Sequence, residues 1–345
     1  MGVMTHTPAE QTLIDLLDGA KDWRAAAREA VVKFGLPTKR AEAWKWSDLR
    51  RATQGIDAPG TAAYRLDGSA IGPQITLGAG EELAIDLVAS AGVGVTALEV
   101  HVPAGQSARL VERHEIAAGA FVTARIEITL GEGAVLERVV ISDIHAEAVA
   151  ALRTRIVIAK NAKLTQSALS FGSKLSRHET HISHAGEGAE VELGAVYLLA
   201  EGRHADFTST VTHEGPGGVT NQLVKGAAAS HAQGVFQGKF KVEQAAQQTD
   251  AKMTHRALML SDKAEIDAKP ELEIYADDVQ CAHGNALGAI DETALFYMRQ
   301  RGLSETKARA MLIESFLAEP LMLIDDEDLR ESATGLLRAR LEAIA

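Results

Sequence analysis

The stretch LGEGAVLE at residues 130–137 decides the fold, because its pattern returns at regular intervals along the chain. Related stretches are PAGQSARL at 103–110, AKNAKLTQ at 159–166 and GEGAEVEL at 186–193. A glycine or asparagine opens each apolar run, and with the next glycine the series is Gly105, Gly133, Asn161, Gly188 and Gly217, spaced by 28, 28, 27 and 29 residues. A sustained period of this length, opened by residues that tolerate positive φ, is typical of stacked β-coils. The pattern predicts a mainly β protein with a parallel β-helix at its centre.

Short β-favouring runs fill the chain between these turns, and no long amphipathic helix interrupts them. Examples are residues 83–88, 97–102, 121–130 and 135–141. A β-sandwich is the competing architecture, since it also contains many short strands. Its turns would recur about every 8 to 12 residues without a sustained longer register. The period therefore favours the β-helix.

Helical patterns are expected at both ends of the chain. Leu13, Leu16 and Leu17 share one helical face near the N-terminus, and Leu336 and Leu337 belong to a similar stripe near the C-terminus. We expect three parts: an N-terminal helical region and Gly-, Ala- and Pro-rich linker (1–70), a β-helix core (71–292) and a C-terminal helical region (293–345).

Composition excludes several classes of function. The formal net charge of −12 makes a nucleic-acid partner a poor fit, since binding phosphates requires clustered Lys and Arg. The N-terminus lacks a basic and apolar leader, and no run reaches the roughly 18 apolar residues of a membrane helix, so we expect a cytoplasmic protein without a membrane partner. The single cysteine, Cys281, excludes an intrachain disulfide and a self-contained four-cysteine site.

Two motifs are weak candidates for chemistry. GVGVTA at 92–97 resembles the start of a dinucleotide fingerprint, but a strand-like sequence follows where the fingerprint needs a helix. His178, His181 and His184 are spaced by three, so on a strand successive members would alternate faces and would not form a metal site. No nucleophile elbow or phosphate-binding loop motif occurs in the sequence.

The informative stretch is ADDVQCAHGNALG at 276–288. Cys281 and His283 are separated by one residue, so on a strand both side chains project from the same face. Thiolate and imidazole together suit iron or zinc, but they supply at most about half of the roughly four ligands of a cluster. The alternative is that Cys281 is a small core residue and that His283 hydrogen-bonds the chain near Gly284.

Residues 221–302, from NQLVKGAAASHAQG to FYMRQRG, resemble the conserved core of the SufB and SufD family of iron–sulfur cluster assembly proteins. GLPTKRAEAWKWSDLR at 35–50 is similar to an N-terminal motif of the same family. The short chain and the single cysteine favour the SufD branch over the SufB branch. The resemblance implies a right-handed parallel β-helix flanked by helical regions.

The resemblance also implies partners and sites. A SufB-like paralogue would pair through the β-helix, and a SufC-like ABC ATPase would dock on helices at about 293–318, with Leu295, Phe296, Met311 and Phe316 as its contacts. His283 would lie at the interface between the paired scaffolds as a cluster or iron ligand, with Cys281 beside it. The chain would be a non-catalytic scaffold for a transient iron–sulfur cluster shared with the partner, and the isolated chain would bind no cofactor tightly.

Two other functions stay open from the residues alone. A homodimeric metal-binding protein could complete one site from Cys281 and His283 of two copies. A β-helical carbohydrate-active enzyme would need aromatic residues for sugar stacking, and 4% aromatic content makes it a weak alternative.

Overall fold

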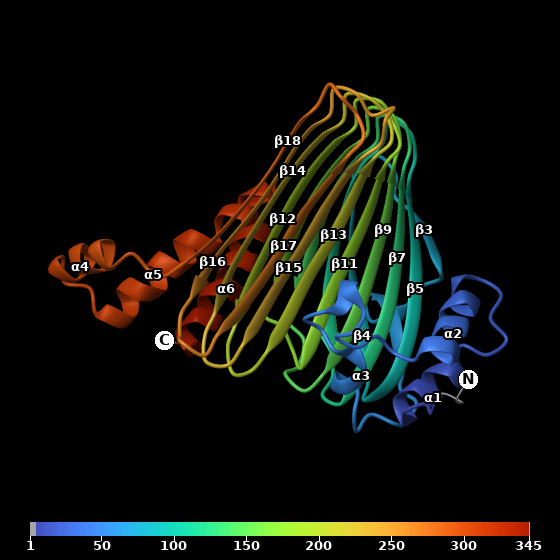
Figure 1. Ribbon diagram of the computed structural model, residues 1–345, viewed down its shortest axis with the longest axis horizontal. Coiled ribbons are helices and arrows are strands. Elements are labelled where there is room, and N and C mark those ends of the chain that lie inside the picture. The colour runs from blue at the N-terminus through green and yellow to red at the C-terminus, as the bar shows by residue number, and fades with distance from the viewer. Residues whose placement is uncertain (1–4, 345) are drawn as a thin grey trace.

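From residue 74 onward, strands that follow one another in the chain lie in two different sheets, so that each pair of strands forms one coil of a parallel β-helix (Figure 1). The computed structural model describes residues 5–344. The ten-stranded sheet has the order β18-β16-β14-β12-β10-β8-β6-β4-β1-β2, and the eight-stranded sheet has the order β17-β15-β13-β11-β9-β7-β5-β3. The β-helix expected from the period is confirmed.

The ten-stranded sheet contains β1 (Ala62–Leu66), β2 (Ser69–Ala70), β4 (Glu81–Ala89), β6 (Ser107–Ile116), β8 (Val135–Ser142), β10 (Lys163–Ser170), β12 (Glu190–Leu199), β14 (Val219–Ala228), β16 (Asp250–Met259) and β18 (Gln280–Gly288). The eight-stranded sheet contains β3 (Gln74–Thr76), β5 (Gly92–Val102), β7 (Ala120–Leu130), β9 (Val149–Ile158), β11 (Leu175–His184), β13 (His204–His213), β15 (Gln233–Val242) and β17 (Glu265–Ile274).

The repeating turns form a hydrogen-bonded column along one edge of the stack. The five predicted turn residues all have positive φ, between 54° and 67°. Each donates its backbone N–H to a carbonyl of the next coil, over 2.8–3.0 Å. Gln248 continues the column with φ 61° and donates to the carbonyl of Asp278 over 2.6 Å. The turns therefore fix the register of the coils as the spacing predicts.

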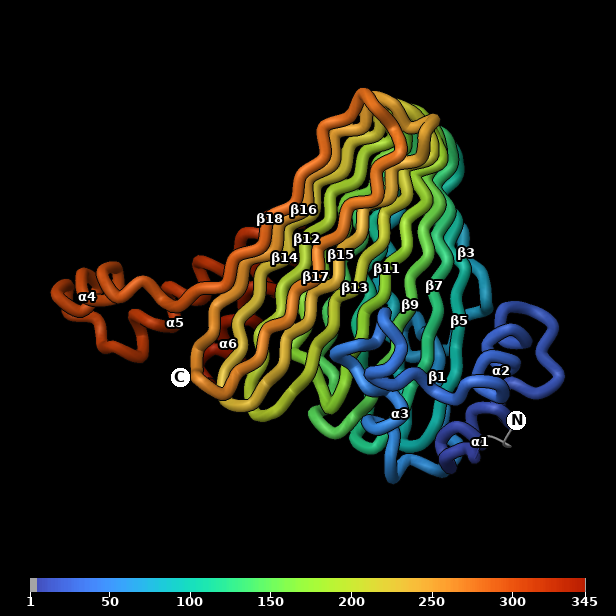
Figure 2. The backbone as a smooth tube through the Cα atoms, in the orientation of Figure 1, coloured from blue at the N-terminus to red at the C-terminus, as the bar shows by residue number. Residues whose placement is uncertain are grey.

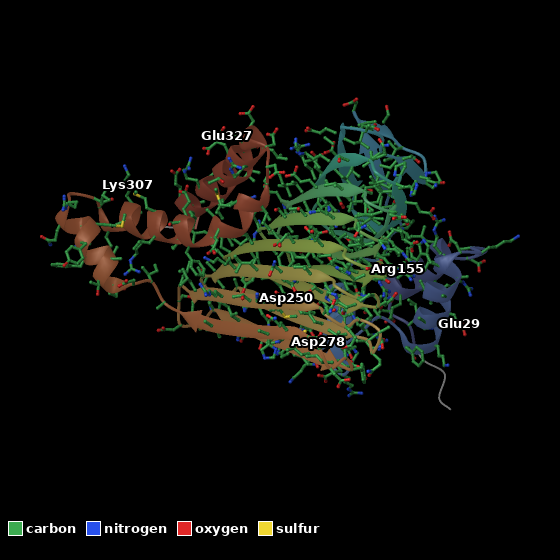
Figure 3. All side chains as sticks on the ribbon, turned by 90° about the horizontal axis from the view of Figure 1, so that it is seen from above. Glu29, Arg155, Asp250, Asp278, Lys307 and Glu327 are labelled. Atoms are coloured by element: carbon green, nitrogen blue, oxygen red, sulfur yellow. The ribbon has the colours of Figure 1, made fainter. Side chains whose placement is uncertain are left out.

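Helices cover opposite flanks of the stack. α1 (Pro8–Leu16), α2 (Trp23–Phe34), η1 (Glu42–Trp44) and α3 (Leu49–Ala52) lie on the N-terminal side, and α4 (Glu292–Gln300), α5 (Glu305–Leu317), η2 (Glu319–Leu323) and α6 (Glu327–Ile344) on the C-terminal side. Glu29 of α2 and Lys307 of α5 mark the two sides in Figure 3. No helix within residues 5–344 is long and apolar enough to cross a lipid bilayer.

Each helical region packs on the outer surface of one sheet. α1 and α2 contribute to a cluster with Val93, Phe121 and Val149 at the starts of adjacent strands of the eight-stranded sheet. α5 and α6 pack against the ten-stranded sheet, where Leu317 and Leu337 join a separate apolar cluster. The interior of the β-helix is a third, continuous core.

The segment 51–70 is more ordered than the linker expected there. It contains the end of α3 and both β1 and β2, and β1 pairs antiparallel with β4. Its small residues allow close crossing, since a Cβ on Gly94 would lie 2.9 Å from Cβ of Ala62. Tyr64 of β1 is 4% exposed and belongs to the interior core. This segment therefore covers the first coil of the β-helix.

The last coil, formed by β17 and β18, is uncovered. Each of these strands pairs on one side only, with β15 and with β16. Eight of the nine residues of β18 are exposed, whereas β16 beneath it alternates between buried and accessible residues. Figure 2 shows both strands at the outer end of the stack. The β-helix thus has one covered end and one open end.

Candidate functional site on the open last coil

Cys281 and His283 lie on β18 and face the interior of the β-helix at its open end. Register gives the direction: Cys281 is paired with Ala251 and His283 with Met253. Both partners on β16 are buried in the interior core, at 0% and 1% exposure. In a parallel sheet paired residues point to the same face, so Cys281 and His283 share that interior face. The same-face prediction from the sequence is confirmed.

Exposure separates the two candidate ligands. His283 is exposed, while Cys281 is partly buried and packs against the interior core. Cys281 also contacts a small cluster formed by Val242, Ala246 and Ala276. The imidazole is therefore accessible to a partner or a metal, and the thiol lies deeper on the same coil.

The environment of Cys281 favours the thiol over the thiolate. Burial raises the pKa of Cys281 above its usual value, and the carboxylate of Asp250 raises it further. A hydrogen bond involving the backbone of Ala251 lowers the pKa by a smaller amount. Cys281 is therefore poorly suited to act as a free nucleophile, but a bound metal would displace the proton because metals bind the thiolate.

A third side chain on the same face of β18 was missed in the sequence. Asn285 follows His283 by two residues and is paired with the buried His255 of β16. Nδ1 of His255 lies 2.8 Å from Oδ1 of Asn285, and Nε2 of His255 lies 2.9 Å from the hydroxyl of Tyr197 on β12. Tyr197 and His255 are both 0% exposed. The contact between Tyr197 and His255 spans 58 residues of sequence and the contact between His255 and Asn285 spans 30, and no local motif signals them.

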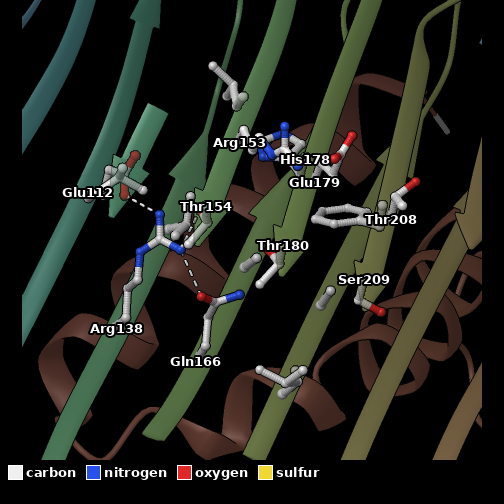
Figure 4. Close-up of a pocket in the computed structure, with 18 of the residues that line it drawn as sticks. Glu112, Arg138, Arg153, Thr154, Gln166, His178, Glu179, Thr180, Thr208 and Ser209 are labelled. Atoms are coloured by element: carbon white, nitrogen blue, oxygen red, sulfur yellow. Dashed lines mark hydrogen bonds and ion pairs between the residues drawn. The ribbon is translucent and has the colours of Figure 1, made fainter. Parts of the chain in front are cut away.

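A separate polar network fills the interior several coils away. Arg138 donates to Glu112 over 2.5 Å and to Gln166 over 2.7 Å, as Figure 4 shows. His114 is 2.8 Å from the same Glu112 carboxylate. Burial raises the pKa of Glu112, but Arg138 and His114 outweigh it and lower the pKa to about 2. The carboxylate is thus ionised and neutralised by its neighbours.

The cavity beside this network has a volume of about 50 Å³. That is space for about three or four water molecules and is too small for a sugar ring. Among its lining residues are His178, Thr180 and Ser209. The geometry therefore gives no support to a carbohydrate-active site in this cavity.

The other sequence candidates take the positions expected for strands. His178 and His184 are on the interior face of β11 and His181 is on its outer face, so the three histidines do not converge. GVGVTA lies within β5, and no helix follows it. Within residues 5–344 no group of three or more His, Cys, Asp or Glu side chains is arranged to hold a metal ion.

Comparison with known proteins identifies the family. Residues 87–316, more than half of the chain, match the family model described as the SUF system FeS cluster assembly SufBD core domain. The chain belongs to the SufBD family.

Curated SufBD relatives match the chain over part of their own length. A SufBD family iron–sulfur cluster assembly protein of Synechocystis sp. is 38% identical over 56% of this chain and 43% of its own length. The iron–sulfur cluster assembly protein SufD of Escherichia coli is 32% identical over 54% of this chain and 44% of its own. A SufBD family protein of Mycobacterium bovis is 29% identical over 63% of this chain and 57% of its own. The chain thus spans about half the length of the relatives it matches.

The motif at 35–50 that resembles the SufBD family anchors the N-terminal region to the eight-stranded sheet. Ser47 donates to Asp206 over 2.5 Å, and Arg177 donates to the same carboxylate over 2.6 Å. The guanidinium of Arg177 lies over the ring of Trp44, with Cζ of Arg177 4.2 Å from the ring centroid. Ser47 and Asp206 are fully buried. No pattern in the sequence predicts these contacts of the motif.

The four predicted ATPase contacts of the SufBD-type C-terminal region differ in exposure. Phe296 is 58% exposed and Met311 is 44% exposed, so both are available at the surface. Leu295 is 3% exposed, and Phe316 is half-buried with its ring 4.4 Å from Nζ of Lys225. Figure 1 shows α4 and the start of α5 extending away from the sheets.

Proposed function

We propose that this chain is a non-catalytic scaffold subunit of a SufBCD-type complex in the cytoplasm. In this complex it supports the assembly of nascent iron–sulfur clusters together with a SufB-like partner and a SufC-like ABC ATPase. The observation that carries the proposal is the open last coil, which presents Cys281 and His283 on one face of an edge strand that pairs on one side only. Membership of the SufBD family supports the same conclusion.

The number of ligands argues for a shared cluster. Iron–sulfur clusters take about four protein ligands, usually cysteine thiolates with histidine as a substitute. Cys281 and His283 would supply two of them, and Cys281 is the only cysteine of the chain. A partner chain would supply the others. The cluster is then cargo that leaves once assembled, because neither scaffold alone encloses it.

The open coil is suited to pairing with a second β-helix. The outer edges of β17 and β18 carry backbone N–H and C=O groups that no other described strand binds. Strands of a partner could add to both edges through backbone hydrogen bonds. Pro270 of β17 lacks an N–H donor, so one position of that strand cannot donate to a neighbouring strand, whereas β18 contains no proline. Pairing here would place the partner directly at Cys281 and His283.

The projecting α4–α5 segment is the proposed docking site of the ATPase. Phe296 and Tyr297 are 58% and 65% exposed and lie edge to face with centroids 6.2 Å apart. Nucleotide-driven closure of two ATPase subunits would move these helices and shift the paired last coils between two arrangements. The energy of the cycle then comes from the ATPase, and the scaffold itself catalyses no reaction.

A symmetric homodimer is the second candidate, favoured by the same free edge. Two copies paired through β18 would bring two Cys281–His283 pairs together across a two-fold axis. Such a dimer would retain iron without any other protein. Light scattering of the isolated chain with an iron assay distinguishes this candidate from the heteromeric scaffold.

Affinity purification of the tagged chain from its native cells under anaerobic conditions tests the proposal. We expect a P-loop ATPase and a larger, cysteine-richer relative to co-purify, and iron to be present in the complex. His283→Ala should leave the set of co-purifying proteins unchanged and reduce the iron, because an exposed ligand is removed and no core volume is lost. Recovery of neither partner, or normal cluster yield from the variant, would contradict the proposal.

A further inference from the structure

The amide of Asn285 is held in one orientation by a buried hydrogen-bond chain. Oδ1 of an asparagine can only accept, so the 2.8 Å contact requires that Nδ1 of His255 carries the hydrogen and donates. Nε2 of a neutral His255 is then an acceptor, and the Tyr197 hydroxyl donates to it over 2.9 Å. The direction of the chain is therefore from Tyr197 to His255 to Asn285.

Burial fixes the middle of this chain. Burial lowers the pKa of His255 to about 4, so the imidazole is neutral near pH 7. Phe236 stacks on the ring of His255 with centroids 5.0 Å apart and an interplanar angle of 19°. Tyr197 is in turn packed closely, because Cβ atoms on Gly226 and Gly234 would lie 1.8 Å and 2.6 Å from its ring. A single tautomer of His255 and a single position of Tyr197 are thereby enforced.

The Nδ2 group of Asn285 is free of hydrogen bonds within the part of the chain that the structure describes. Asn285 is exposed, and no other hydrogen bond of its side chain occurs within the described residues. Asn285 follows His283 by two residues on the same face of β18, so their Cα atoms are about 7 Å apart. Two N–H donors therefore lie beside the candidate ligands in a fixed orientation.

We propose that Asn285 is a third member of this site, a fixed hydrogen-bond donor to the sulfur atoms of a cluster bound through Cys281 and His283, with His255 and Tyr197 as its positioning residues. This inference rests on the proposed scaffold function. Amide N–H groups stabilise the negative charge on cluster sulfur, and hydrogen bonds to sulfur raise the reduction potential of a cluster. Partners that support metal ligands in this way typically change affinity by about 10- to 100-fold.

The first test uses the chain without metal. Long-range ¹H–¹⁵N correlation spectra of the histidine side chains should show His255 protonated at Nδ1 and not at Nε2. Asn285→Ala and Tyr197→Phe should each weaken this preference, since each removes one of the two partners. A wild-type His255 protonated at Nε2 overturns the proposal.

The second test uses the complex reconstituted anaerobically with ferrous iron and sulfide. Asn285→Ala should load a cluster to the wild-type level, lose it to a chelator about tenfold faster and show a lower reduction potential. Asn285→Asp should have the same or a larger effect because it replaces the donor by an acceptor. Tyr197→Phe should reproduce a smaller part of the change, which a purely structural role of Asn285 would not produce.

The His283→Ala variant distinguishes failure of the donor role of Asn285 from failure of the proposed scaffold function. If His283→Ala fails to load while Asn285→Ala matches the wild type in cluster loss and potential, the scaffold function stands and the donor role is wrong. If Asn285→Ala fails to load at all, Asn285 acts as a ligand and the donor role is again wrong. If His283→Ala loads normally, the proposed function itself is wrong and the donor role with it.

Discussion

Tyr197 and Gly226 are paired residues on β12 and β14, and the tyrosine ring occupies the space that a side chain at Gly226 would need. A Cβ at Gly226 would lie 1.8 Å from Cζ of Tyr197. Tyr197 is fully buried and its hydroxyl is bound to His255, so the ring has no free direction in which to move.

Gly226→Ala should therefore destabilise the protein by about 1–3 kcal/mol or more, which is the usual range for overpacking a core. Urea denaturation followed by circular dichroism measures the change. Gly335→Ala in α6 is the matched control, because nothing lies within 4 Å of the new methyl group and helical alanine is favoured over glycine. Equal stability of the two variants would contradict the packing argument.

Acid should destabilise the β-helix well above the pH at which ordinary carboxylates titrate. Burial lowers the pKa from 6.5 to about 3 in His178 and His213 and to about 4 in His204 and His255. The unfolded chain takes up protons near pH 6.5 while the folded chain does not. Stability is thus fully present above pH 6.5 and falls as the pH decreases, by about 1.4 kcal/mol per pH unit for each histidine.

Urea midpoints at pH 7.5, 6.5, 5.5 and 4.8 measure this dependence. A second loss begins below about pH 4.5, because Glu112 and Glu179 have pKa values lowered to about 2 in the folded protein. His213→Gln should make the curve between pH 6.5 and 4.8 less steep. Stability that stays constant over this range would show that these histidines are not buried in their neutral form.

Substitutions in the contacts that hold residues 35–50 on the eight-stranded sheet should differ strongly in their cost to the free energy of unfolding. Asp206→Ala leaves the guanidinium of Arg177, 2% exposed, with only the longer 3.3 Å contact to Glu179 and should cost about 3–5 kcal/mol. Ser47→Ala removes the hydrogen bonds of its hydroxyl to Asp206 and His204 and should cost about 1–2 kcal/mol. Glu314→Ala breaks the surface pair with Arg338 and should cost less than about 1 kcal/mol. Chemical denaturation of the three variants measures these costs. A reversed order of the costs would show that Asp206 and Ser47 do not hold the N-terminal region on the sheet.

Cys281 should alkylate slowly at neutral pH. Burial and Asp250 raise its pKa, and only the thiolate reacts, so the pH midpoint of iodoacetamide labelling should lie above the value of about 8.5 for a free thiol. Asp250→Asn should lower the midpoint and speed labelling at pH 7.5. Mass spectrometry of the intact chain follows the reaction. A midpoint below that of a free thiol would contradict the described environment.

A charge on the projecting helices should weaken ATPase binding without unfolding the chain. Phe296→Asp alters a side chain that is 58% exposed, so we expect weaker binding with an unchanged melting temperature. Met322→Asp is the matched control, since Met322 is 64% exposed but lies on η2, away from the projecting segment. Leu295→Asp should lower the melting temperature because Leu295 is buried. Surface plasmon resonance measures the binding. If Met322→Asp weakens binding as much as Phe296→Asp does, the projecting segment is not the docking site.

Much of the architecture could be predicted from the turns. Gly105, Gly133 and Asn161 indicate the coils because each turn requires a positive φ, and glycine and asparagine are the residues that adopt it most readily. Gln248 adopts the same conformation 31 residues after Gly217, but glutamine is not a residue type that indicates positive φ. The turn near the end of the β-helix is therefore harder to predict from the sequence. The sequence predicts a linker in the segment containing β1, because its small residues, which permit close crossing, are also typical of a flexible connection.

The candidate site was only partly predictable for a related reason. Alternation along one strand places Cys281 and His283 together, which is a local property. The contact between Asn285 and His255 depends on a 30-residue register, and the contact between His255 and Tyr197 on a 58-residue one. Such pairings follow from the exact length of each coil, and a change of one residue would turn the side chain to the other face.

Because Cys281 and His283 lie on the terminal coil, the number of coils in the β-helix does not affect which residues are exposed at its open end. Each coil contacts mainly its neighbours, so the gain or loss of one interior coil would leave the last coil unchanged and would move it by about 4.8 Å along the stack. Chains of this architecture can thus differ in the number of coils and still end in the same pair of edge strands.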